Sequence, residues 1–147
     1  SSDDLIVLTK ETLMTAKPNQ LNEIYDNIAA KHLTDKDRTA LTRDGVPILL
    51  QPDPVWPKLH EEASRLMATS DPDSIEAMDL AKRWMQKVFE TTGGDPDLTQ
   101  KVRDVTRALN DNPTFQAATT ASNSMTEFVE QAYAAAIKAG LMDRPEV

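Results

Sequence analysis

Residues 71–98 read DPDSIEAMDLAKRWMQKVFETTGGDPDL, and this stretch decides the fold. Its small and apolar residues recur every three or four positions, as on one face of a helix: Ala77, Ala81, Trp84 and Val88. Two glycines then favour a helix stop. The Asp-Pro pair after them is typical of a helix start, because aspartate accepts hydrogen bonds at the N-cap and proline fixes φ at the first helical position. The stretch therefore predicts one complete helix and the beginning of the next.

The same signals recur along the rest of the chain. A capping residue followed by proline occurs at Asp53-Pro54, Asp71-Pro72, Asp95-Pro96 and Asn112-Pro113. We expect the four glycines to lie where helices stop: Gly45, Gly93, Gly94 and Gly140. Apolar periodicity predicts helices over residues 10–16, 19–32, 34–43, 54–68, 73–91, 98–109 and 125–136. No alternating strand pattern of useful length occurs, and residues 44–55 form the longest non-helical stretch. The sequence therefore predicts an all-α bundle of about five to seven helices.

Composition excludes several classes of function. The 147 residues suffice for one domain whose core needs no metal or disulfide. There is no cysteine, which excludes a zinc ribbon or a thiol nucleophile. The 16 basic and 24 acidic side chains give a net charge of −8, and because the basic ones are scattered we expect no direct contact with nucleic acid.

Hydropathy predicts the compartment. The longest apolar runs, residues 5–8 and 46–50, are far shorter than the roughly 20 residues of a membrane span. The first residues are acidic, whereas a signal peptide begins with a basic region. We therefore expect a cytoplasmic protein that does not contact a membrane.

Motifs for catalysis or metal binding do not assemble in this sequence. His32 and His60 lie in different predicted helices without a metal-ligand spacing. The turn at residues 93–96 lacks the Lys and Ser/Thr of a phosphate-binding loop, and Ser122 and Ser124 lack a nucleophile elbow. We therefore expect no enzymatic activity, no metal and no cofactor. The apolar stripe around His60 favours a hydrogen-bonded structural histidine.

The large aromatic side chains are placed unusually. Trp56 and Trp84 are the only tryptophans, and each lies on a stripe of small or aliphatic residues. With His60, Met85 and Phe89 they would line a cavity between two antiparallel helices, which suits a flat heteroaromatic ligand. The alternative is that these residues only fill a core, and periodicity alone favours that alternative.

Several segments follow one another in a characteristic order. Val55-Trp56-Pro57-Lys58-Leu59 opens a helix, and Ala77-Met78-Asp79-Leu80-Ala81-Lys82-Arg83-Trp84-Met85 lies in the next. The Gly-Gly-Asp-Pro turn with Leu98 and a late Asn112-Pro113 come before the helix with Phe128 and Tyr133. This order covers about three quarters of the chain, His32 to Leu141. It resembles the TipA-S type of antibiotic-recognition domain, found in MerR-family regulators and in stand-alone albicidin-binding resistance proteins.

The resemblance implies a globin-like all-α fold that encloses a groove or tunnel for a polycyclic or peptidic antibiotic. It divides the chain into an N-terminal helical segment or linker, residues 1–33, and a TipA-S-like ligand-binding domain, residues 34–147. Residues 33–43, with the apolar loop after them, would be a lid over the ligand, and their few apolar side chains agree with that role. Some family members capture thiopeptides through a cysteine, which this chain lacks, so binding would be reversible.

The leading hypothesis is a non-enzymatic domain that binds a bulky aromatic or peptidic antibiotic or another hydrophobic ligand. It would serve as the sensor of a transcription regulator or as a drug-sequestering resistance protein. The expected ligand-binding residues are Trp56, His60, Trp84, Met85, Phe89, Phe115, Phe128 and Tyr133. The alternative is a helical protein–protein interaction module with a structural aromatic core and an exposed apolar patch over residues 5–8 and 48–50. Because the sequence contains no helix-turn-helix, DNA binding or homodimerisation would require a region upstream.

Overall fold

The computed structural model describes residues 18–141, which fold into seven α-helices and one short β-hairpin. The helices are α2 (Pro18–His32), α3 (Asp35–Ala40), α4 (Val55–Thr69), α5 (Ile75–Thr92), α6 (Pro96–Asp111), α7 (Pro113–Ala118) and α8 (Asn123–Lys138). The strands β1 (Thr42–Arg43) and β2 (Val46–Pro47) are followed by a 3-10 turn, η1 (Ile48–Leu50). The predicted all-α bundle is confirmed for this part of the chain. The helix predicted over residues 10–16 lies outside the described residues.

Most helix boundaries follow from local capping chemistry. Asp95 and Asn112 cap α6 and α7, each with proline in the first helical turn, as the sequence predicts. The start predicted at Asp71 is wrong, because Ser74 is the N-cap of α5 and its hydroxyl accepts a hydrogen bond from a backbone N–H of the first turn. Gly93 ends α5 in the left-handed conformation, as predicted.

The hairpin corrects two predictions about residues 34–45. The helix predicted over residues 34–43 ends at Ala40, and the residues after it form β1, which pairs antiparallel with β2. Asp44 and Gly45 connect the strands with φ values of 56° and 75°. Two consecutive positive φ angles suit a tight hairpin turn, so Gly45 serves the hairpin and not a helix stop.

The buried apolar side chains of residues 18–141 fall into two clusters. The α2–α6 cluster consists of Tyr25, Ala29, Leu33, Leu41, Leu98, Val102, Val105 and Leu109. The α4–α5–α8 cluster consists of Leu59, Ala63, Leu66, Ala77, Leu80, Ala81, Trp84, Phe128, Val129 and Ala132. The described part of the chain therefore has two centres of apolar packing.

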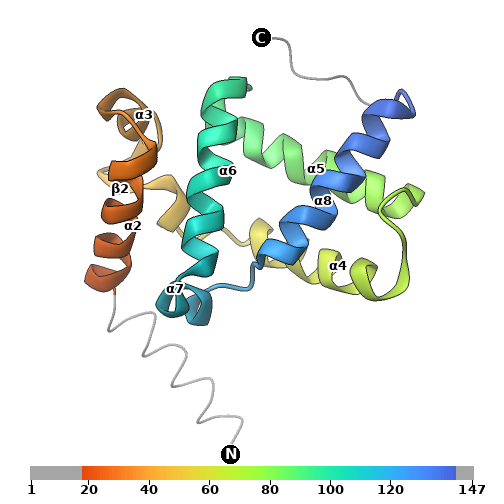
Figure 1. The fold of residues 1–147 in the computed structure, drawn as a ribbon, viewed down its shortest axis with the longest axis horizontal. Helices are drawn as coiled ribbons and strands as arrows, with labels where there is room; N and C mark the ends of the chain where they lie inside the picture. The colour runs from red at the N-terminus through yellow and green to blue at the C-terminus, as the bar shows by residue number, and fades with distance from the viewer. Residues whose placement is uncertain (1–17, 142–147) are drawn as a thin grey trace, which may run out of the picture.

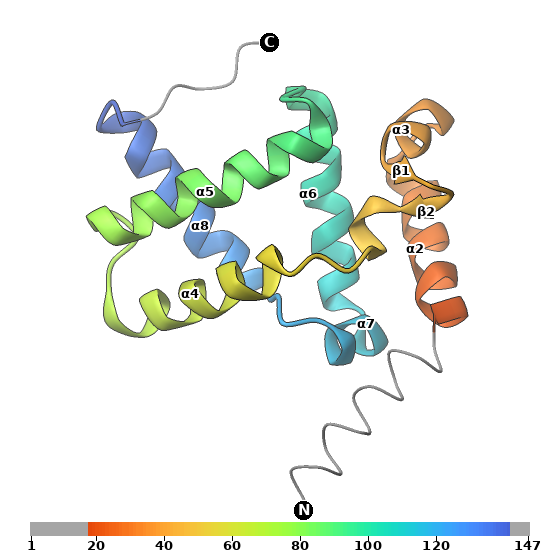
Figure 2. The same cartoon turned by 180° about the vertical axis from the view of Figure 1, so that it is seen from behind.

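The two clusters lie at opposite ends of the molecule. Figures 1 and 2 show α2 alongside α6 at one end, with α3 and the hairpin above α2, whereas α4, α5 and α8 gather at the other end. α5 crosses towards α6, so the turn after α5 leads from one end of the molecule to the other. Residues on both sides of position 33 contribute to the α2–α6 cluster.

The segment around α3 is attached to the α2–α6 cluster by apolar and charged contacts. Leu33 and Leu41, which flank α3, are both buried. Thr34 and Asp37 form a capping box at the start of α3. The carboxylate of Asp37 also accepts a hydrogen bond of 2.7 Å from Nζ of Lys101 on α6. This bond is the largest cause of the low pKa of Asp37, about 2.

The apolar loop after the hairpin is partly covered by the protein itself. Leu49 and Leu50 pack against the α2–α6 cluster, and Ile48 is half-buried. The exposed apolar patch that the interaction-module alternative expects over residues 48–50 is therefore wrong for this segment. Residues 5–8, the other half of that patch, lie outside the described residues.

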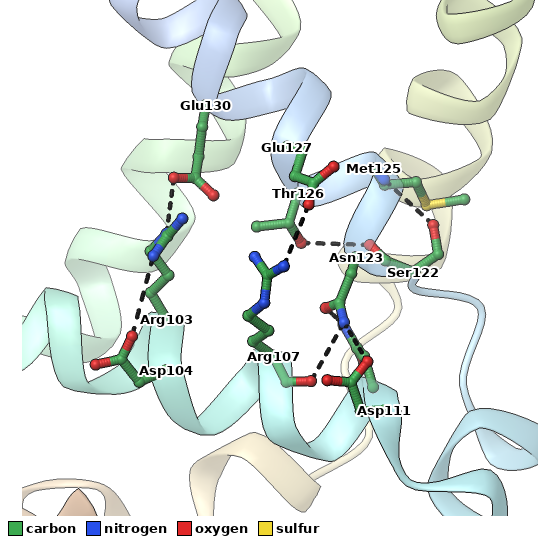
Figure 3. Close-up of polar contacts among 11 residues, drawn as sticks. Arg103, Asp104, Arg107, Asp111, Ser122, Asn123, Met125, Thr126, Glu127 and Glu130 are labelled. Carbon is green, nitrogen blue, oxygen red and sulfur yellow. Dashed lines mark hydrogen bonds and ion pairs between the residues drawn. The ribbon is translucent and has the colours of Figure 1, made fainter.

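Polar side chains connect the two ends of the molecule where α6 meets α8, and we call these contacts the α6–α8 interface (Figure 3). Nε of Arg103 lies 2.7 Å from a carboxylate oxygen of Glu130, and a guanidinium nitrogen of Arg107 lies 3.4 Å from Glu127. Asn123, in the first turn of α8, donates to the backbone carbonyl of Arg107 at 3.3 Å. Ion pairs and hydrogen bonds are thus prominent where the two helices meet.

Candidate functional site

Three aromatic rings meet between α4 and α5, and we call Trp56, His60 and Trp84 the aromatic trio. Trp56 and His60 are four residues apart on α4, so their side chains lie on the same face of the helix. Their ring centroids are 5.8 Å apart in a stacked arrangement. Trp84 of α5 meets Trp56 edge-on at 5.2 Å and His60 at 5.4 Å. Each ring therefore contacts both others at distances typical of favourable aromatic pairs.

The members of the trio differ in burial. His60 and Trp84 are only 8% and 7% exposed, whereas Trp56 is half-buried. Trp84 belongs to the α4–α5–α8 cluster, and Trp56 packs against it. The indole of Trp56 therefore packs against buried neighbours on one side, while part of its surface is accessible to solvent.

His60 has a specific hydrogen-bond partner. Its Nδ1 lies 2.7 Å from the hydroxyl oxygen of Thr120, in the segment between α7 and α8. The expectation of a buried, hydrogen-bonded histidine is confirmed. Burial also lowers the pKa of His60, because desolvation penalises the charged imidazolium.

The other predicted ligand-binding residues divide between the two clusters. Phe128 is buried beside Trp84 in the α4–α5–α8 cluster, and Met85 and Tyr133 are partly buried against that cluster. Phe115 instead packs against the α2–α6 cluster, so the structure does not bring it to the trio. Phe89 is half-buried on α5 and is not a member of either cluster as described for residues 18–141.

The charge next to Trp84 is neutralised within the protein. The guanidinium of Arg83 donates two hydrogen bonds to the Glu62 carboxylate, at 2.8 and 2.6 Å, and a third to Asp79 at 3.0 Å. The bonds to Glu62 are the largest cause of a raised pKa of Arg83. This bidentate pair links α4 to α5 on a flank of the trio, so Glu62 is more than a solvated helix face.

A second ion pair fixes the segment that leads into α4. Pro54, not Asp53, occupies the N-cap position, and the Asp53 carboxylate accepts a hydrogen bond from the N–H of Val55 at 2.9 Å. The same carboxylate lies 2.7 Å from Nζ of Lys87 on α5. The hydrogen bond from Lys87 is the main cause of the lowered pKa of Asp53. The approach to Trp56 is therefore tied to the helix that carries Trp84.

Sequence reasoning missed Thr120 and the role of Glu62. Thr120 lies 60 positions from His60, in a segment with no periodicity, and no local pattern connects the two. Glu62 and Arg83 lie on different helices, and their pairing depends on how α4 and α5 pack. Hydroxyl and carboxylate side chains are common on protein surfaces, so the presence of a threonine or a glutamate does not by itself predict a contact with the site.

The burial of His60 predicts a pH dependence of stability. Because its pKa in the folded protein lies below the 6.5 of the unfolded chain, the unfolded state binds more protons between the two values. We expect the free energy of unfolding to fall as the pH drops below about 6.5, by at most about 1.4 kcal/mol per pH unit from this group. Urea unfolding at pH values from 7.5 to 5 measures this slope.

The variant His60→Gln should lose this part of the slope, whereas His32→Gln should retain it because His32 is exposed. Asp37 titrates in a lower window, between 3.8 in the unfolded chain and about 2 in the folded protein, where its stabilising contribution is lost on acidification. Equal slopes for the wild type and His60→Gln would contradict the prediction.

Two further searches concern metals and membranes. Among residues 18–141, no three His, Asp or Glu side chains lie close enough together to hold a metal ion. None of the helices in this range is long and apolar enough to cross a membrane. Comparison with protein-family models, with curated proteins and with solved structures finds no match to this chain.

Proposed function

We propose that this chain is a non-enzymatic binding domain for a bulky aromatic or peptidic antibiotic, with the aromatic trio as its main contact surface. The observation that carries the proposal is the partly exposed ring of Trp56, which stacks on His60 and meets the edge of Trp84. A rigid aromatic surface held by buried neighbours binds a flat ring system with little loss of side-chain entropy. The resemblance to TipA-S-type domains supports the same ligand class.

The segment before α4 leads directly to the trio. The apolar loop of residues 46–50 continues through residues 51–54 into α4 and Trp56. The resemblance implies that residues 33–43 cover the ligand, but Leu33 and Leu41 are buried in the α2–α6 cluster, at the opposite end of the molecule from the trio, so the proposal includes no such lid. Hydrogen bonding to the ligand would come from His60, whose present partner is the exposed Thr120.

The same geometry argues for binding rather than catalysis. His60 contacts the hydroxyl of Thr120, but within residues 18–141 no carboxylate is described in contact with its ring, as would be needed to orient it as a general base. Two ion pairs hold charged side chains of the elements that carry the trio, Arg83 with Glu62 and Lys87 with Asp53.

Tryptophan fluorescence tests the proposal directly. A panel of thiopeptides, albicidin and other polycyclic antibiotics is titrated into the wild type, and we expect at least one compound to quench or shift the emission saturably. Trp56→Leu should weaken the binding of that compound about tenfold or more, because an aromatic stack contributes on the order of 1.4 kcal/mol. Met67→Ala, an exposed apolar change on the same helix, is the matched control and should leave the affinity unchanged.

The outcome that would overturn the proposal is also specific. If no compound changes the emission, and Trp56→Leu alters only the free energy of unfolding, the trio is structural. The burial of His60 and Trp84 would then be explained by the alternative of a helical interaction module with an aromatic core.

A further inference from the structure

The two apolar clusters belong to two structural units that alternate along the chain. The α2–α6 unit contains α2 to η1 together with α6 and α7, that is, residues 18–50 and 96–118. The α4–α5–α8 unit contains residues 55–92 and 123–138. The chain therefore passes between the units three times, through the linkers at residues 51–54, 93–95 and 119–122.

Side-chain contacts fix each linker region, and the first also has a hydrogen bond of 3.0 Å from Arg43 to Gln51. Asp53 of the first linker pairs with Lys87 of α5 at 2.7 Å. The hydroxyls of Thr92 and Thr99 lie 2.9 Å apart across the second linker. Thr120 of the third linker contacts His60 at 2.7 Å. The third contact differs from the others, because its partner is a member of the aromatic trio.

The linkers differ in backbone character. The second contains Gly93 and Gly94 at φ values of 68° and 79°, whereas the first contains two prolines, whose rings fix φ and leave rotation to the neighbouring bonds. The third links the end of α7 to Ser122, which caps α8. Hinge motions concentrate in a few residues at element ends, as all three linkers are.

The contacts described between α6 and α8 are polar: two ion pairs, and hydrogen bonds of Asn123 with Asp111 and Asn110. The Arg103–Glu130 and Arg107–Glu127 pairs of the α6–α8 interface have side chains about 37–53% exposed. Ion pairs this accessible contribute roughly 0–1 kcal/mol each. In contrast, each unit buries its own set of fully covered side chains, such as Leu109 in one and Leu66 in the other. Reorientation of the units would therefore cost much less than unfolding either one.

We propose that the two units reorient about these three linkers, and that the His60–Thr120 hydrogen bond couples this motion to the aromatic trio. The coupling rests on the proposed function, whereas the hinge does not. A ligand that stacks on Trp56 and takes over the hydrogen bond of His60 releases Thr120 and with it the third linker. The α6–α8 interface then loses one of the constraints that hold α8 to α6, and the units adopt a different relative orientation.

Spin-label distances test the hinge without a ligand. Because the chain has no cysteine, Asn27→Cys on α2 and Gln131→Cys on α8 place labels on exposed positions of the two units. The pair Arg65→Cys and Gln131→Cys lies within one unit and is the internal reference.

We expect Thr120→Val to broaden or shift the Asn27–Gln131 distance distribution and to leave the Arg65–Gln131 distribution unchanged. Thr106→Val makes the same substitution on α6, at a threonine with no hydrogen bond described for its hydroxyl, and should change neither distribution.

Thr120→Val tests the hinge, and the addition of a ligand tests its coupling to the trio. Unchanged Asn27–Gln131 distances in Thr120→Val would overturn the hinge. If that variant does not fold, as judged by circular dichroism, Lys87→Gln breaks the contact at the first linker. A changed Asn27–Gln131 distance would then support the hinge, and an unchanged one would overturn it.

The coupling is tested by adding albicidin and one thiopeptide to the labelled wild type. A saturable change in tryptophan fluorescence without any change in distance would overturn the coupling and leave the binding function intact. A distance change in Thr120→Val with no fluorescence response to either compound would support the hinge and count against the proposed ligands.

Discussion

Replacement of Trp84 by alanine is expected to lower the free energy of unfolding by about 3–5 kcal/mol, a large part of the total stability of a domain this size. Trp84 is buried in the α4–α5–α8 cluster and contacts both other rings of the trio. Removal of the indole leaves a cavity between α4 and α5 and deprives Trp56 and His60 of their neighbour. Urea or thermal unfolding followed by circular dichroism measures the loss.

The matched control is Phe89→Ala, which removes a half-buried aromatic ring from the same helix, outside both clusters. It should cost much less than Trp84→Ala. Similar losses in the two variants would contradict the assignment of Trp84 to the packed core. For binding experiments the consequence is practical: Trp56 can be varied with the core intact, whereas a loss of binding in Trp84→Ala would report mainly on the fold.

Replacement of Leu41 by alanine is the second change with a large expected effect, about 2–5 kcal/mol. Leu41 is fully buried in the α2–α6 cluster, and its N–H and the capping box at Thr34 help to define the end and the start of α3. Because the clusters are separate, we expect the damage to be local. Hydrogen exchange should accelerate over residues 33–50 and much less in α4, α5 and α8.

Val46→Ala is the control for this variant, since Val46 lies in the same segment but is 42% exposed. It should leave hydrogen exchange close to that of the wild type. Equal acceleration in both apolar clusters of Leu41→Ala would contradict the division into two units.

Local signals in the sequence predicted the helices, because periodicity and capping act over a few residues. Asp95 and Asn112 were sufficient to place the starts of α6 and α7, and Gly93 the end of α5. The misplaced start at Asp71 has a local cause as well. Asp71 and Ser74 both offer an acceptor oxygen, and the structure places the helix after the second of them.

The candidate site was predictable only where its members share a helix face or a motif. The spacing of Trp56 and His60 places both on one face of α4, and the meeting with Trp84 agrees with the expected pairing of the two helices. The sequence predicts Phe115 in the same site, but α7 places it against the α2–α6 cluster. The contact of Thr120 with His60 depends on the path of a non-helical segment, which periodicity does not describe.

The alternation of the two units along the chain also constrains the order in which the protein folds. The α2–α6 unit combines residues 18–50 with residues 96–118. During synthesis α2 therefore cannot complete its packing until α6 has been made. The α4–α5–α8 unit is completed only with residues 123–138, although α4 and α5 can pair as soon as both exist. Early in synthesis the α4–α5 pair, joined by residues 70–74, closes a much shorter loop than the α2–α6 pair, and both cores depend on contacts between distant parts of the chain. Removal of α8 alone would leave every member of the α2–α6 cluster in place while exposing one face of Trp84 and its neighbours to solvent.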